Sequence, residues 1–495
     1  MNFNLSTASI EEDSRLIIGL FEGGELSPAA KKIDKVMKGY LSKMIKQDMF
    51  QGKLGQTLFL FYPAGTKIEY LLLVGCGKVE ALKPSGFRKI ISQSIKALST
   101  AKITQITSCL AELDIPGKSL AWKVKQLVEA TYDGIYRFDL FKSEKEPVSS
   151  LKEITIHLPH STQLDACKKA LQQGQAIASA AILTKNLANL PSNICTPAFL
   201  AEQAKELAKN YKKLSITILE EKDMEKLGMG AILAVSQGSA QEAKLICLEY
   251  KGTAKKQAPI ALIGKGITFD TGGNSLKSPD AMVGMKYDMC GAASVLGTLK
   301  ALAELALPVN VVGIIPAVEN MPGGTAYKPE DILTSLSGQT IEVISTDAEG
   351  RLILADALTY CERYQPEIVI DIATLTGAVV IALGNHATGL LSNYPPLAHD
   401  LLKAGEESND RAWELPLWDE YQEQIKSPFA DMANTGGRSA GTITAGCFLS
   451  RFAKKFHWAH LDVAGTAAIM GGTSERMATG RPVPMLVQYF LDKVK

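Results

Sequence analysis

Short apolar runs separated by polar turns dominate the first third of the chain. Residues 57–76, TLFLFYPAGTKIEYLLLVGC, read as two buried strands around a turn. The β-branched runs ITQITSCL (103–110) and EITIHLPH (153–160) predict further strands, with helical stretches between them. We therefore expect a small α/β domain over residues 1–160.

A long stretch with few helix breakers follows this region. Residues 163–187, QLDACKKALQQGQAIASAAILTKNL, place alanine and leucine at helical spacing. The segment PSNICTP (191–197) contains two prolines, which are expected to end the helix. The pattern predicts a connecting helix over residues 161–187.

Apolar β-branched runs and helical stretches alternate through residues 188–495. The runs LICLEY, PIALIGKG, VNVVGIIPAV and EIVIDIATL alternate with the helical segments GAASVLGTLKALAEL and RLILADALTYCERY. Such alternation favours a largely parallel sheet covered on both faces. The predicted fold class is α/β: a smaller N-terminal α/β domain, and a larger C-terminal α/β domain with a mixed, largely parallel central sheet. Ligands of such sheets bind at the carboxyl ends of the strands.

The segment KKIDKVMKGYLSKMIK (31–46) carries six lysines, as segments that bind nucleic acid also do. Its apolar positions, however, share one helical face. They are Ile33, Val36, Met37, Tyr40, Leu41 and Met44. We interpret the segment as one amphipathic helix whose lysines face solvent.

Composition narrows the class of protein. The 495 residues are 46% hydrophobic and 21% charged with a net charge of +1, so a nucleic-acid partner is not indicated. No apolar stretch reaches membrane-spanning length and the N-terminus lacks a secretory pattern, which predicts no membrane association and a cytoplasmic location. The eight cysteines form no CxxC pair, as expected for reduced, buried thiols.

The loop GKGITFDTGGNSLKS (264–278) follows an apolar strand and is rich in glycine. It does not match the P-loop pattern, because Asn274 follows its last glycine, nor the dinucleotide-binding pattern, because Phe269 stands at the third glycine position. The charged residues that remain are Lys265, Asp270 and Lys277. On their own they suggest a structural ion pair.

Further carboxylates lie near other strand ends. In STDAEGRL (345–352), Asp347, Glu349 and Arg351 occupy alternate positions after the run IEVI, so an extended backbone would place them on one face. Adjacent like charges repel unless a cation lies between them, which indicates a metal site. Asp288 begins the helix after the glycine loop, where an N-cap role is the alternative.

Four carboxylates would be balanced by two divalent cations. Oxygen ligands suit Mg²⁺ or Mn²⁺, and Zn²⁺ accepts them beside a nitrogen. The six histidines lie outside these segments, which excludes a histidine-rich zinc site.

These segments resemble the signatures of the leucyl aminopeptidase family, the two-metal cytosol aminopeptidases. The resemblance rests on GKGITFDTGG with SLK, MKYDMCGAA and TDAEGRL, and it continues through DIATLTGA, WELPLWDEY, ADMANTGGRSAGTITA, HLDVAGTA and ATGRPVP. It covers residues 185–495, whereas the first 160 residues resemble the family mainly in length and α/β character.

The resemblance implies a ligand set for two cations, Mn²⁺ or Zn²⁺. Asp270 and Glu349 would bridge the two metals. Lys265, as a neutral amine, and Asp288 would complete one site, and Asp347 the other. Two metals about 3.5 to 4 Å apart would activate a shared water, and one of them would bind the free amino terminus of the substrate.

The resemblance also implies roles for residues that bind no metal. Lys277 would polarise the scissile carbonyl, and Arg351 would hold a bicarbonate ion that acts as general base. The substrates would be peptides with a free N-terminus, with leucine-type residues preferred, and the chain would form a homohexamer.

Four residues match the positions that form the family's substrate pocket. Met285, Thr374 and Gly377 would form the wall that receives the first side chain, and Leu375 would offer backbone contacts. For Met285, ordinary packing is an equal alternative.

Three residues depart from the usual motifs: Asn274, Ser278 and Ser345. We expect Ser345 to bond locally and shift a loop contact without loss of metal binding. The other two leave fine substrate preference open.

Two other functions compete with this interpretation. Residues 437–441, GRSAG, match the serine-hydrolase elbow, but DMANTG before them is not a buried strand. A non-catalytic binding or regulatory role on the same fold is the main alternative. It would be favoured by loss of a ligand or of a catalytic residue, and all seven are present.

Overall fold

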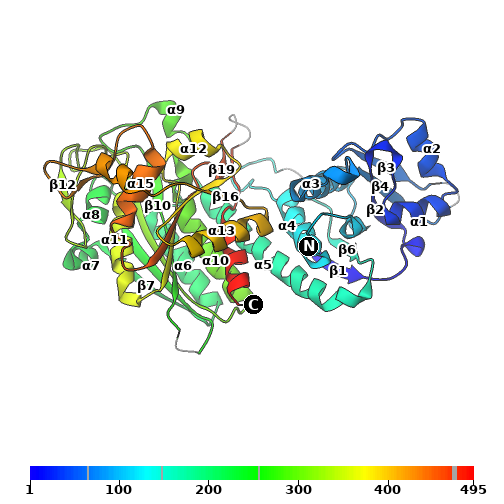
Figure 1. The fold of residues 1–495 in the computed structure, drawn as a ribbon, viewed down its shortest axis with the longest axis horizontal. Helices are drawn as coiled ribbons and strands as arrows, with labels where there is room; N and C mark the ends of the chain where they lie inside the picture. Colours follow the sequence, from blue (N-terminus) through cyan, green and yellow to red (C-terminus); the bar gives the residue numbers. More distant parts are fainter. Residues whose placement is uncertain (64–65, 146–148, 255–256, 471–475, 495) are drawn as a thin grey trace. The chain divides into compact units, whose positions relative to one another are not determined.

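A six-stranded sheet organises the first of two units into which the chain divides, Met1–Ala178 and Ser179–Lys495 (Figure 1). The computed structural model describes residues 1–63, 66–145, 149–254, 257–470 and 476–494. The helix α5, Leu164–Asn189, runs across the boundary between the units. Within the described residues, no helix combines the length and apolar character needed to cross a membrane.

The sheet of the first unit is mostly parallel. Its order is β1 (Asn2–Ser6), β6 (Glu153–His157), β5 (Gln105–Ser108), β2 (Arg15–Leu20), β4 (Tyr70–Gly75) and β3 (Thr57–Phe61), with β3 antiparallel to β4. Alternate residues of β2 point to opposite faces. Ile17 packs with α3 (Pro84–Thr100) and α4 (Leu120–Ile135), whereas Leu16 and Ile18 pack with α1 (Pro28–Val36) and α2 (Tyr40–Lys46).

The lysine-rich segment forms two helices, so the prediction of one continuous helix is wrong. Lys38 and Gly39 adopt φ values of 54° and 79°, which end α1 before α2 begins. The carboxylate of Asp34 then accepts the backbone N–H of Leu41 at 2.8 Å. The amphipathic face was predicted correctly at Ile33, Leu41 and Met44, which are buried, but Tyr40 is exposed.

A nine-stranded mixed sheet forms the centre of the second unit. Its order is β16 (Ala412–Glu414), β15 (Thr388–Ser392), β18 (His457–Asp462), β14 (Ile368–Ala373), β9 (Ile260–Gly264), β11 (Asn310–Asn320), β8 (Lys244–Lys251) and β7 (Leu214–Glu220), and β10 (Gly266–Asp270) pairs with β11. The central strands β18, β14, β9, β11 and β10 are parallel, and the antiparallel pairs lie toward the edges. The predicted two-domain α/β fold with a mixed, largely parallel sheet is confirmed.

Helices and short strands complete the second unit. The helices are α6 (Pro197–Asn210), α7 (Glu221–Leu227), α8 (Gly230–Ser236), α9 (Pro279–Met282), α10 (Cys290–Glu304), α11 (Gly350–Cys361), α12 (Gly377–Leu383), α13 (Pro395–Ser408), α14 (Asp419–Gln422), α15 (Gly441–Ser450) and α16 (Val483–Lys493). The short strands are β12 (Ile332–Thr334), β13 (Thr340–Glu342), β17 (Met432–Ala433), β19 (Ala468–Ile469) and β20 (Met477–Ala478). The helices α10 and α11 are almost entirely buried, which explains why apolar residues occur all round them.

A buried carboxylate on α11 stabilises this unit. Asp356 accepts the backbone N–H groups of Ala231 and Ile232 in the first turn of α8, at 3.0 and 2.9 Å, and that of Leu336 at 2.7 Å. We expect Asp356→Ala to lower the free energy of unfolding by about 3 kcal/mol, because three amide groups lose their acceptor. Urea denaturation beside the control Glu362→Ala, at the end of the same helix, would measure it. Equal small losses in both variants would contradict this role.

Candidate metal centre and active site

A cavity of about 370 Å³ lies beside the ends of β9, β10 and β14. Every residue predicted for the site lines it except Arg351. The cavity wall also contains residues that the sequence did not indicate: Gly284, Tyr287, Thr376, Val380, Ala464, Ala468 and Met470. The structure therefore brings residues of the three charged segments and the four predicted pocket residues to one place.

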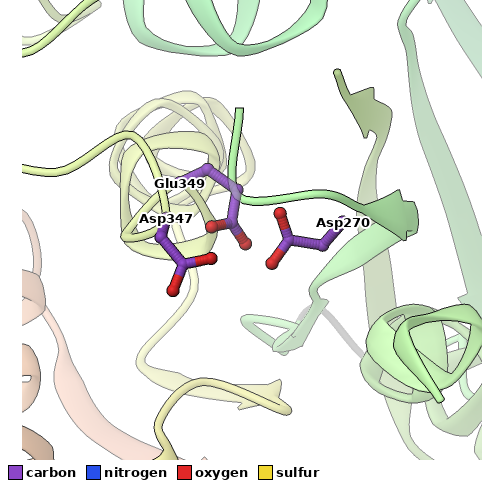
Figure 2. A group of neighbouring side chains, drawn as sticks. All are labelled: Asp270, Asp347 and Glu349. Carbon is purple, nitrogen blue, oxygen red and sulfur yellow. The ribbon is translucent and has the colours of Figure 1, made fainter. Parts of the chain in front are cut away.

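Three carboxylates converge in this cavity. One oxygen each of Asp270, Asp347 and Glu349 lies within 4.8 Å of the others (Figure 2). Asp270 ends β10, whereas Asp347 and Glu349 precede α11. Oε2 of Glu349 is buried and accepts no hydrogen bond from any described residue. Like charges at this spacing need cations between or beside them.

Lys265, between β9 and β10, contributes one positively charged side chain to the cavity. Its Nζ lies 2.8 Å from Oδ2 of Asp288 and 2.9 Å from Oε1 of Glu349, and it donates to the carbonyl of Thr374 at 3.0 Å. A Cβ at Gly350 would lie 2.5 Å from Cε of Lys265, so this glycine makes room for the lysine.

Lys277 contributes the second positively charged side chain. Its Nζ lies 2.8 Å from Oδ2 of Asp270 and also pairs with Oδ1 of Asp347. Gly272 and Gly273, with φ values of 87° and 62°, turn the chain between Asp270 and Lys277. The two glycines thus form a turn beside the carboxylate of Asp270. This turn is not a P-loop, as the sequence pattern predicted.

Burial and neighbouring charges perturb the ionisable groups of the cavity. Burial, followed by the nearby charge of Asp270, raises the pKa of Glu349 to about 8, and burial raises the pKa of Asp288 to about 6. Burial disfavours the charged form of Lys265, but Asp288 and Glu349 outweigh it and raise the pKa of this lysine above its ordinary range. Without a bound cation, the cluster therefore retains protons.

The segment before α11 is a turn, so the prediction of an extended backbone there is wrong. Glu349 has helical dihedral angles, φ −76° and ψ −34°, and Arg351 lies in the first turn of α11. Arg351 is buried outside the cavity wall, and its Nη1 donates to the carbonyl of Asn434 at 2.8 Å. Its Nε has no partner among the described residues, and burial lowers its pKa to about 10.

Asp288 does not cap a helix. It lies in the short helix Met285–Met289, and α10 begins afterwards with Met289 at its N-cap position. Its Oδ1 accepts the hydroxyl of Thr374 at 2.7 Å while Oδ2 faces Lys265. The N-cap alternative is therefore wrong.

The three residues that depart from the motifs do not line the cavity, and each makes a hydrogen bond elsewhere. Oγ of Ser345 accepts the backbone N–H of Asp347 at 3.2 Å, as expected for a serine that bonds within its own turn. Ser278 caps α9, and the amide of Asn274 donates to the carbonyl of Tyr327 at 3.0 Å.

The residues present fit divalent cations. Four carboxyl groups face two lysines in the cavity, so that full ionisation would leave an excess of two negative charges, and the unpaired Oε2 of Glu349 offers a free ligand atom. A cluster of carboxylate oxygens at the strand ends of an α/β sheet, beside a partly apolar cavity, is typical of a metal-dependent enzyme.

Comparison with known proteins makes the assignment more specific. Residues 182–487 match the cytosol aminopeptidase family, catalytic domain, and residues 17–145 match the N-terminal domain of the same family. Probable cytosol aminopeptidases from Nitrosococcus oceani and Thioalkalivibrio sulfidiphilus are each 53% identical to the chain; both alignments cover 100% of this chain, and 99% and 100% of the respective relatives.

Solved structures agree with this result. A mutant of tomato leucine aminopeptidase superposes with a TM-score of 0.88 at 33% identity, covering 99% of this chain and 96% of that one. The bottromycin maturation enzyme BotP in complex with Mn gives 0.84 at 30% identity, covering 97% and 100%. The chain belongs to the cytosol aminopeptidase family. It is a metallo-aminopeptidase, as the sequence motifs predicted.

Proposed function

We propose that the chain releases N-terminal amino acids, leucine-type residues preferentially, by using two divalent cations per chain. The observation that carries the proposal is the convergence of Asp270, Asp347 and Glu349 within 4.8 Å of one another. Asp270 and Glu349 would be shared between the cations, with Lys265 and Asp288 on one side and Asp347 on the other. Manganese in the BotP complex supports Mn²⁺, and Zn²⁺ remains the alternative.

Bound cations would supply an activated water and a Lewis acid for the peptide carbonyl. The protein's own residues orient the substrate. The Lys277 ammonium, 14% exposed at its side chain, would donate to the carbonyl oxygen as negative charge develops there. The buried Nε of Arg351, which has no described partner, supports an anion partner such as bicarbonate in the role of proton acceptor.

The cavity wall supports the preference for apolar side chains. Met285 lines it, as predicted, and Leu375, Val380, Ala468 and Met470 line it as well. These unbranched and branched aliphatic groups match a leucine-type side chain in kind. Thr374 and Gly377 complete the wall that we assign to the first residue of the substrate.

A substrate comparison tests this function. The purified chain supplied with Mn²⁺ or Zn²⁺ is expected to hydrolyse leucine amide and leucyl peptides. N-acetylated versions of the same peptides should resist cleavage, because the free amino group is one of the groups recognised. Equal cleavage of free and acetylated peptides would exclude an aminopeptidase mechanism of this kind.

Metal binding should depend on pH. Because the pKa of Glu349 is raised to about 8, this carboxyl is protonated at neutral pH and must lose its proton when a cation binds. The ammonium of Lys265 must also lose a proton to bind a cation as a neutral amine. The affinity for the cations is therefore expected to fall as the pH falls from about 8.5 to 6.5. Calorimetric titration of metal-free protein with Mn²⁺, in buffers of different ionisation enthalpy, would count the released protons. Constant affinity across this range would contradict the assignment.

A homohexamer and a cytoplasmic location are further proposals. The family resemblance suggests the hexamer, and the relatives' name, cytosol aminopeptidase, supports the location. Light scattering should give six times the mass of one chain, and the mass of a single chain would contradict the hexamer. A non-catalytic role on this fold is disfavoured, because every predicted metal ligand lines the cavity.

A further inference from the structure

We propose that Asn320 is a positioning residue that fixes the two carboxylate-bearing segments relative to each other and thereby sets metal affinity. The inference rests on the proposed metal site. Asn320 is the last residue of β11, lies next to β10 in the sheet and is fully buried. It is absent from the cavity wall, so any effect on the metal must act through the ligands.

The amide of Asn320 bonds to both segments at once. Its Nδ2 donates to Oδ1 of Asp270 at 2.8 Å and to the carbonyl of Thr346 at 3.1 Å. Thr346 immediately precedes Asp347 in the turn that carries the other two carboxylates. One amide group therefore connects a ligand at the end of β10 to the backbone of the turn before α11.

These bonds determine which oxygen of Asp270 faces the cavity. Oδ1 accepts both from Asn320 and from the backbone N–H of Gly272, each at 2.8 Å. Oδ2 is thereby directed to Lys277. Because one ligand oxygen is oriented and the carboxylates repel one another, a donor outside the ligand set stabilises the arrangement that a cation needs.

A second donor to the same carbonyl provides a matched control. The hydroxyl of Tyr327 also donates to the carbonyl of Thr346, at 2.8 Å. Among the described residues, this hydroxyl makes no hydrogen bond to Asp270, so Tyr327→Phe removes a buried bond to the turn alone. Asn320→Leu, in contrast, keeps the branching at Cγ and removes the bonds to both segments.

Calorimetric titration of the metal-free full-length protein with Mn²⁺ tests the proposal. Asn320→Leu and Asn320→Ala should each weaken the affinity about 10- to 100-fold. Tyr327→Phe should weaken it less than about threefold. At saturating Mn²⁺, KM for leucine amide should return to the wild-type value in the Asn320 variants, because Asn320 does not line the cavity.

Two comparisons separate the possible failures. Wild-type affinity in both Asn320 variants would overturn the positioning role, even if the melting temperature of the metal-free protein fell, because that pattern assigns the residue to folding alone. Equal losses in Tyr327→Phe and Asn320→Leu would overturn it as well. Asp347→Ala serves as the ligand control: unchanged affinity there would refute the proposed metal site itself.

Discussion

Replacing Lys277 by alanine is expected to lower kcat about 10²- to 10³-fold while the protein retains its metal. This range is the effect of removing one positioned donor that stabilises a developing oxyanion. Metal affinity should not fall, because the ammonium of Lys277 shares Asp270 and Asp347 with any cation that binds there. Removing the ammonium frees these carboxylates for the metal.

Kinetics and metal analysis on the same preparation would measure both parts of this expectation. Lys328→Ala provides the control, since Lys328 is exposed and forms an ion pair with Asp331, three residues further along the chain. A Lys277→Ala enzyme with near-normal kcat would remove this lysine from the mechanism. Loss of metal together with activity would instead assign Lys277 to metal binding.

Replacing Asp347 by alanine is expected to remove one cation per chain and to lower kcat at least about 10³-fold. A metal that activates water supplies several kcal/mol, and each 1.4 kcal/mol is a factor of ten in rate. Asp347 is the most exposed of the three clustered carboxylates, at 40% for its side chain. Its loss should therefore disturb packing less than replacement of the buried Glu349.

Elemental analysis after dialysis against metal-free buffer would count the bound cations. Asp280→Ala is the control, because this exposed aspartate of α9 lies near the site but outside the cavity wall. Full metal content in Asp347→Ala would contradict the assigned ligand set. So would loss of metal in both variants.

The fold was largely predictable because its core strands carry strong local signals. The apolar runs at 260–264 and 368–373 became central parallel strands, and the breaker-poor run became α5. The lysine-rich segment was harder, because apolar spacing does not reveal a change of direction. The sequence shows Gly39, the residue that allows the helix to end. The hydrogen bonds that Asp34 accepts from Leu41 and Ser42, which hold the start of α2, form only in the folded chain.

The site was predictable where motifs specify it and unpredictable where only packing does. The charged ligand candidates stood in recognisable segments, although the reason given for STDAEGRL, an extended backbone, was wrong. Arg351 lies in the first turn of α11, is absent from the cavity wall, and donates to the carbonyl of Asn434. Ala468, Met470 and Asn320 carried no local signal, since their places depend on strands and turns far away in the chain.

Activity as a function of bound metal tests the central claim most directly. Protein stripped of metal by dialysis against EDTA should not hydrolyse leucine amide, and stepwise addition of Mn²⁺ should restore turnover up to a plateau at two equivalents per chain. A stripped protein that remains fully active, or a plateau reached without a second equivalent, would contradict a mechanism based on two cations held by these carboxylates and Lys265.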